Sequence, residues 1–230
     1  QAQAAGFETI GIDLISGLPG RCLKDLEEDL KMANDLNIQH ISVYILSLDS
    51  DSVFEKLAGK GKFRPLDDDM LAEHYLFVSD YLKNAGYEHY EISNFAKDSK
   101  YSKHNTAYWQ QKPYIGLGAA AHSYDLVSRQ WNVAHIGKYI DSLNKGVLLF
   151  EKEKLMSFDQ YNEYLMTNFR TMWGIDLHYL KNTYPGPWDE LAEKLENYEA
   201  RGLMETDGGK TRMTERGWLV SDGIFSELFV

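Results

Sequence analysis

The stretch TIGIDLISG, residues 9–17, decides the fold of the first part of this 230-residue chain. Its apolar and β-branched residues form a near-continuous run that ends at a glycine, which predicts a buried strand. Residues 18–36 then carry apolar side chains at helical spacing, and QHISVYILSL (39–48) is again typical of a buried strand. The two strand starts lie about 30 residues apart, which is the length of one β-α-β unit. We therefore expect two parallel strands joined by a crossover helix.

Four further stretches carry helix or strand signals. Residues 70–84 repeat apolar side chains at helical spacing, and Gly86 after them is typical of a helix end. YEHYEISNFA (87–96) alternates like a strand that leads into a loop. YIGLGAAAHSYD (114–125) predicts a strand or turn of small residues, and IGKYIDSLNKG (136–146) predicts a short helix.

The character of the chain changes from about residue 151. Helical patterns at 157–172 and 189–202 are followed by METDGGKTRMT (204–214), in which two short extended runs meet at a hairpin signal. Helices followed by a hairpin and a last helix are typical of a winged-helix-like module. Residues 151–230 hold nine Lys and Arg against fifteen Asp and Glu, which opposes phosphate binding. We expect a protein-facing or lid domain.

Composition excludes several classes of protein. A net charge of -11 and a pI near 5.1 oppose electrostatic binding to nucleic acid or to an anionic membrane surface. No apolar run approaches the roughly 20 residues of a membrane span. Cys22 is the only cysteine, so no intrachain disulfide and no cysteine-rich metal site can form from this chain alone. We expect a cytoplasmic protein.

Asp13 interrupts the first strand just before the turn SGLPG (16–20). The carboxyl ends of parallel strands commonly meet ligands, and a carboxylate buried there without a partner would be costly. Asp13 therefore either contacts a ligand or caps the following turn or helix, and the pattern leaves both open. The glycines and proline of GLPG need no ligand to explain them.

GLGAAA (116–121) matches the dinucleotide fingerprint G-x-G-x-x-G/A. The context that this fingerprint requires is missing, because no βαβ unit continues from it and no acidic residue follows about 20 residues later at the end of a second strand. The small residues are explained more simply by the close approach of a large group to the backbone, and His122 follows immediately.

HNTAYW (104–109) places an imidazole, a carboxamide, a phenol and an indole within six residues. Packing in a core or at a domain interface would account for them. A binding surface is the alternative, because the motif follows the polar loop KDSKYSK (97–103), and loops are common places for binding residues. An imidazole can ligate iron while neighbouring rings cover a planar macrocycle.

Taken in order, these stretches resemble the oxygen-independent coproporphyrinogen III oxidase family of radical S-adenosylmethionine (radical SAM) proteins. The resemblance is closer to its HemW branch, the heme chaperones, because HNTAYW matches an HNxxYW pattern that the oxidases lack. The tail from residue 195 onward is similar to the family's C-terminal domain. The other motifs that carry the resemblance are GIDLISGLPG, HISVYILSL, GYEHYEISNFAK, YIGLGAAAHSY and RQWNV.

The resemblance implies an α/β fold with two domains: the C-terminal part of a partial (β/α) radical SAM barrel over residues 1–148, then a small winged-helix-like α+β domain over 149–230. In the family a CxxxCxxC loop binds a [4Fe-4S] cluster, and this sequence lacks that loop. Cys22 alone cannot hold a cluster by three thiolates. We expect the chain to be a piece of a longer protein and inactive as an enzyme by itself, with a natural short homologue as the alternative.

By the same resemblance, Asp13, Ile45 and His122 fall where the family contacts S-adenosylmethionine. The oxidases tend to carry an apolar residue at the position of His122. We expect this cofactor to bind weakly here, because the absent cluster normally chelates its amino and carboxylate groups. We also expect the strand edge at residues 9–16, which an opened barrel leaves unpaired, to associate with another chain or to be covered.

The HNxxYW pattern is associated with heme binding, so we expect His104 to contact heme. Tyr108 and Trp109 would pack flat against the macrocycle, and Asn105 would orient it by a hydrogen bond. Heme or a porphyrin and a heme-acceptor protein are the expected partners. The alternative function is the oxidase, which converts propionates to vinyls and needs cations for several carboxylates. Residues 104–131 offer only Lys112 and Arg129, which favours the chaperone.

Overall fold

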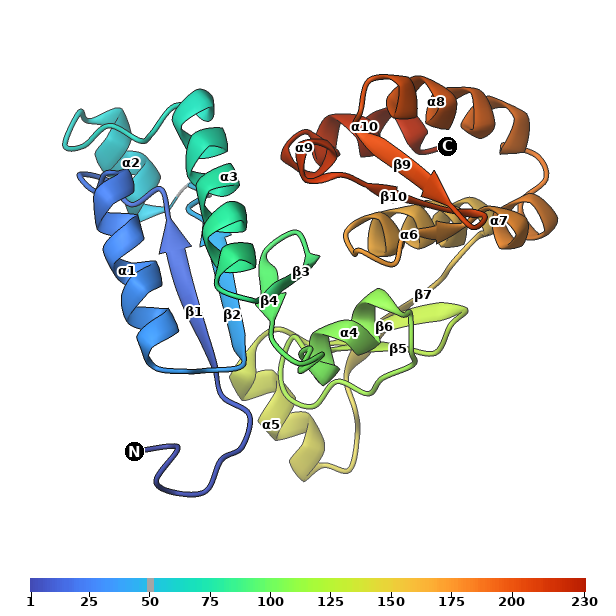
Figure 1. Cartoon of the computed structure of the whole chain (residues 1–230). Coiled ribbons are helices and arrows are strands. Elements are labelled where there is room, and N and C mark those ends of the chain that lie inside the picture. The colour runs from blue at the N-terminus through green and yellow to red at the C-terminus, as the bar shows by residue number, and fades with distance from the viewer. Residues whose placement is uncertain (49–51) are drawn as a thin grey trace. The chain divides into compact units, whose positions relative to one another are not determined.

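The computed structural model describes residues 1–48 and 52–230 (Figure 1). The chain divides into two compact units, Gln1–Ser102 and Lys103–Val230. The domain boundary expected between residues 148 and 149 stays a prediction. Of the polar stretch at 49–69, residues 49–51 lie outside the described residues.

The first unit opens with the predicted β-α-β arrangement. Strands β1 and β2 are parallel, with Asp13 opposite Ser42, and α1 connects them. The expectation of two parallel strands joined by a helix is therefore confirmed. The described elements of this unit are β1 (Gly11–Ser16), α1 (Leu23–Asp35), β2 (His40–Ile45), α2 (Val53–Gly59), α3 (Asp68–Asn84), β3 (Glu88–Glu91) and β4 (Asn94–Ala96).

Capping explains where the helices of the first unit begin. Helix α1 starts after Cys22, whose backbone N–H donates to the Asp25 carboxylate at 2.7 Å. Helix α3 starts two residues before its predicted beginning, because the Asp67 side chain accepts from the Met70 N–H at 3.0 Å. Their apolar faces bury a core with β2 and β4. Its members include Leu26, Leu30, Ile41, Val43, Val78, Leu82 and Phe95.

The segment 87–96 forms a hairpin, where the sequence indicated a strand leading into a loop. Strands β3 and β4 are antiparallel, with an irregularity between His89 and Glu91. Strand β4 also pairs with β2, so the sheet order is β1-β2-β4-β3. Strand β1 is thus an edge strand of the described sheet, and its predicted association stays a prediction.

The second unit begins with a short helix and a three-stranded sheet in the order β5-β6-β7. The small-residue stretch at 114–125 is mostly irregular, with an isolated bridge between Tyr114 and Tyr124 and three residues of strand. Strand β7 was not predicted, because all five of its residues are exposed and it lacks apolar alternation. These elements are α4 (Lys103–Trp109), β5 (His122–Tyr124), β6 (Ser128–Asn132), α5 (Ile136–Asn144) and β7 (Phe150–Lys154).

The rest of the second unit has the element order of a winged helix, as predicted. The two-residue turn of its hairpin is formed by Gly208 and Gly209, whose φ angles are 56° and 79°, in the region that glycine favours. Its elements are α6 (Ser157–Phe169), β8 (Ile175–Asp176), α7 (Leu177–Thr183), α8 (Trp188–Ala200), β9 (Met204–Asp207), β10 (Lys210–Met213), α9 (Glu215–Leu219) and α10 (Ser221–Leu228).

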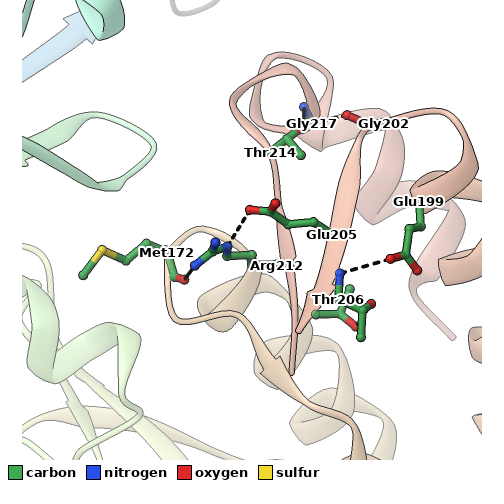
Figure 2. A network of polar contacts seen from close by, with 9 residues as sticks. Met172, Glu199, Gly202, Glu205, Thr206, Arg212, Thr214 and Gly217 are labelled. Atoms are coloured by element: carbon green, nitrogen blue, oxygen red, sulfur yellow. Dashed lines mark hydrogen bonds and ion pairs between the residues drawn. The ribbon is translucent and has the colours of Figure 1, made fainter. Parts of the chain in front are cut away.

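Arg212, a charged residue of this hairpin, has hydrogen-bond partners within the same unit. Arg212 of β10 donates to the Glu205 carboxylate of β9 at 2.7 Å and to the Met172 carbonyl at 3.5 Å (Figure 2). The backbone N–H of Thr206 donates to the Glu199 side chain at 3.2 Å. Arg212 is therefore satisfied within the protein, in keeping with the acidic charge of this module.

Candidate functional site

The HNTAYW motif lies in helix α4, directly after the loop that the sequence indicated before it. Helical spacing places His104 and Tyr108 on one face, because residues four apart are neighbours on a helix. Their rings meet edge to face, with centroids 4.8 Å apart and planes at 83°. The His104 side chain is exposed, and Asn105 is partly buried. An accessible imidazole thus sits beside an aromatic ring.

A row of tyrosines continues from this pair. Tyr114 packs edge to face on Tyr108, with centroids 4.6 Å apart, and Tyr124 lies 6.0 Å from Tyr114. Two backbone hydrogen bonds of 2.9 Å join Tyr114 and Tyr124. The sequence did not single out these tyrosines, because their pairing depends on the fold of the loop between them.

Trp109 faces a different environment from His104. The guanidinium of Arg170 lies over the Trp109 ring, 4.9 Å from its centroid. The indole Nε1 is buried and has no hydrogen-bond partner in the described part of the chain. Trp109 therefore packs against the protein while His104 is open to solvent, and the binding surface stays a prediction.

Between α4, β6 and α6 lies a cavity of about 230 Å³, lined in part by Tyr108, Trp109 and Tyr124. Arg129 and Glu163 also line it and form an ion pair of 2.9 Å. Burial raises the pKa of Glu163 above its usual value, although the Arg129 charge acts in the opposite direction. Arg129 is thus already neutralised by a protein carboxylate.

The proposed cofactor residues of the first unit lie in neighbouring strands but on different faces. Asp13 is exposed, and the register places it beside Ser42 of β2. Ile45 pairs with the buried Ser16, so its side chain leaves the sheet on the opposite face from Asp13. Tyr44, next to Ile45, shares the face of Asp13. Ile45 can meet a ligand on the Asp13 face only through its backbone.

The register extends from Asp13 into a row of polar residues that the sequence did not reveal. Ser42 pairs with Asn94, and Asn94 pairs with Glu91. Asn94 and Glu91 are buried, and the Asn94 amide donates to the Glu91 carboxylate. This row offers oxygen atoms, which suit a ligand that carries hydroxyl or amino groups. Helix α1 is capped by Cys22 and Asp25, so it does not use Asp13 as a cap.

His40 lies one pleat away from this row on the same face. Its Nε2 lies 2.7 Å from the Tyr90 hydroxyl, and both side chains are buried. Desolvation lowers the pKa of His40, while the charges of Asp13 and Glu91 act against that shift. The only sequence signal for this network was the presence of polar residues inside strands.

His122, the third proposed cofactor residue, lies in β5 of the second unit and is exposed. Its ring stacks on Trp131 of β6, with centroids 5.9 Å apart. A Cβ added to Gly116 would collide with the backbone carbonyl of His122. Gly116 therefore admits the chain's own backbone, whereas a Cβ on Gly118 would meet no atom within 4 Å.

The residues present do not fit an iron–sulfur cluster. Cys22 is exposed at the start of α1 and is the only thiol in the sequence. Among residues 1–48 and 52–230, no group of three His, Cys, Asp or Glu side chains could hold a metal ion. No helix in residues 1–48 and 52–230 has both the length and the hydrophobicity needed to cross a membrane.

Known proteins of one group are similar to this chain along nearly its whole length. The HemN C-terminal domain model matches residues 157–220. The heme chaperone HemW of Bacillus subtilis is 33% identical over 227 residues, covering 98% of this chain and 60% of that protein. HemW of Lactococcus lactis is 29% identical with the same coverage. The chain thus spans about 60% of the length of these relatives.

A mitochondrial protein and a solved structure are also similar to this chain. A mitochondrial radical S-adenosyl methionine domain-containing protein 1 of Bos taurus is 28% identical, over 95% of this chain and 52% of that protein. The solved structure of coproporphyrinogen III oxidase (HemN) from Escherichia coli, a radical SAM enzyme, matches with a TM-score of 0.74 and 18% identity. That match covers 100% of this chain and 56% of the other, and it confirms the expected fold.

Proposed function

Because this chain belongs to the radical SAM family of HemW and HemN proteins, we propose that it binds heme as part of a heme chaperone. The observation that carries the proposal is the exposed His104 imidazole, held edge to face against Tyr108 on α4. An accessible imidazole is a common axial ligand of heme iron, and aromatic rings beside it cover the macrocycle. Helix α4 thus supplies both kinds of contact.

The residues of the motif take different roles in this proposal. His104 ligates the iron through a ring nitrogen, and Tyr108 packs beside the macrocycle. Trp109 anchors α4 through its contact with Arg170, which limits how far its ring can turn toward a ligand. Asn105, in the same turn as His104, orients the ligand by a hydrogen bond.

The oxidase is the weaker alternative. An enzyme that acts on propionates needs free cations near its substrate. Residues 104–131 contain one arginine and one lysine: Arg129 is paired with Glu163 at 2.9 Å, and Lys112 is exposed. The HemW relatives are 33% and 29% identical to this chain, against 18% for the HemN structure, which favours the chaperone.

A S-adenosylmethionine contact remains part of the proposal for the whole protein. Asp13 fits a cofactor that carries hydroxyl and amino groups, because its exposed carboxylate accepts hydrogen bonds. Ile45 would contribute its backbone, and His122 would contribute from β5. Cys22, the only thiol in the sequence, does not fit the iron–sulfur cluster. A cytoplasmic location and transfer of heme to an acceptor protein complete the proposal.

A heme titration followed in the Soret region tests the function. The native chain should bind heme saturably, and His104→Ala should weaken binding about tenfold or more and shift the Soret maximum, because the axial ligand is lost. The matched control is His178→Ala, which removes another exposed imidazole of the same unit. Equal binding by both variants and the native chain would contradict a role for His104, and no saturable binding would contradict the function.

A further inference from the structure

A second hollow, of about 750 Å³, lies on one face of the β5-β6-β7 sheet. Ser123, Gln130 and Lys152 are neighbours in the strand register, so their side chains leave the sheet on the same face. This size is within the range of ligand pockets in proteins. The hollow is lined by Pro113, Tyr114, Ile115, Ser123, Tyr124, Asp125, Ser128, Gln130 and Lys152.

The rim of this hollow exposes uncovered apolar surface. Ile115 lines it and is 84% exposed, and nearby Leu117 is 87% exposed. These are the two highest exposures among the large hydrophobic side chains of the described residues. Covering such surface with an apolar ligand is favourable, because it removes hydrocarbon from water.

The row of tyrosines that starts at Tyr108 of α4 also lines this hollow, through Tyr114 and Tyr124. The ring of Tyr114 contacts Tyr108 of α4 at 4.6 Å and also lines the hollow. Its backbone is fixed by two hydrogen bonds with Tyr124, another lining residue. A heme macrocycle is wide enough to contact several neighbouring aromatic rings. A heme bound at α4 would therefore have Tyr114 beside it.

Lys152 gives the hollow a cation that can turn to a ligand. Its Nζ lies 3.4 Å from the Asp125 carboxylate, and its side chain is half exposed. Asp125 has closer partners, because it accepts from the Ser128 hydroxyl and from the Ser128 N–H, each at 2.7 Å. Asp125 therefore stays satisfied if Lys152 moves to another carboxylate.

We propose that this hollow holds part of the heme macrocycle, with Tyr114 as its wall and Lys152 bound to a heme propionate. The inference rests on the proposed function and adds the site of the macrocycle and of its carboxylate. A flat apolar ring with a carboxylate side chain matches the aromatic wall, the uncovered Ile115 and the single lysine of the lining.

The test compares heme titrations of Lys152→Gln and Lys154→Gln. Both residues are exposed lysines of β7, but only Lys152 lines the hollow. Lys152→Gln should weaken heme binding about tenfold, because a charge-assisted hydrogen bond is lost, whereas Lys154→Gln should not. With the dimethyl ester of heme, whose propionates carry no charge, the two variants should bind equally.

A second variant tests the hollow independently of charge. Gln130→Trp should fill it and weaken heme binding, with the melting temperature measured alongside to establish folding. Heme binding that depends on His104 but is unchanged by Lys152→Gln and by Gln130→Trp would overturn this inference and leave the function standing. No saturable binding by the native chain would instead overturn the function, and this inference with it.

Discussion

The ring of Tyr114 packs edge to face against the ring of Tyr108, with centroids 4.6 Å apart and planes at 81°. This contact joins helix α4, which carries the HNTAYW motif, to the segment that enters the β5-β6-β7 sheet. The position of His104 therefore depends on aromatic packing that extends beyond the motif. A substitution at Tyr108 therefore tests whether this packing stabilises α4, while His104 itself is left unchanged.

Replacing Tyr108 should loosen α4. Tyr108→Leu should lower the free energy of unfolding by about 1–2 kcal/mol, because it loses edge contacts with both His104 and Tyr114. Tyr108→Phe, which keeps the ring, should change it by less than about 0.5 kcal/mol. Denaturant unfolding measures both, and equal losses would show that the ring contacts do not stabilise α4.

Gly116 should tolerate no side chain. Gly116→Ala should destabilise the protein by about 1–3 kcal/mol, because its Cβ meets the backbone of His122 and one of the two segments must move. Gly223→Ala is the control, since it lies in α10 with no atom nearby and should stabilise by about 0.5–1 kcal/mol. Thermal unfolding that ranks the two variants the other way would contradict this packing.

Acid should destabilise the first unit through His40. Its pKa is lowered in the folded state by burial, so the unfolded chain takes up a proton first as the pH falls below about 6.5. The contribution of His40 to stability is complete above that pH and is lost as the pH falls toward the lowered pKa.

His40→Gln should therefore reduce the fall in unfolding free energy between pH 7 and pH 5. The exposed His178→Gln should leave that slope close to that of the native chain. Urea unfolding at several pH values measures the slopes, and an unchanged slope for His40→Gln would remove His40 as its cause.

The edge of β1 should promote association. Strand β1 pairs only with β2 in the described sheet, and Ile15 on it is 50% exposed. Ile15→Lys should reduce the mass measured by light scattering, because a charge on an edge strand opposes pairing with another chain. Met32→Lys, at an exposed position of α1, should not. A monomeric native chain would contradict the prediction.

S-adenosylmethionine should bind this chain weakly. The one thiol of the sequence cannot hold the cluster that the resemblance implies as chelator of this cofactor, which leaves Asp13, Ile45 and His122 as the expected contacts. Calorimetry should detect no micromolar binding. Micromolar affinity that Asp13→Asn abolishes would show that the polar groups of the chain suffice.

Local patterns predicted much of the fold. The apolar runs of β1 and β2 and the helical spacing between them predicted the parallel pair, and Gly208 with Gly209 predicted the last hairpin. Strand β7 was missed, because its residues are all exposed and carry no apolar alternation. The hairpin of β3 and β4 was missed because its turn, at Ile92 and Ser93, lacks the glycine or asparagine that marks such turns in a sequence.

The sequence by itself determined the helices and strands with strong periodicity, the acidic charge that opposes nucleic-acid binding, the resemblance to HemW and HemN proteins, and the motif that carries His104. Only the tertiary structure decided that Ile45 lies on the opposite face from Asp13, and that Tyr114 stands between α4 and a hollow with Lys152. The physical reason is the distance along the chain over which each signal acts. Periodicity reports which face of its own element a residue occupies, whereas strand register and ring contacts depend on segments far apart in the chain.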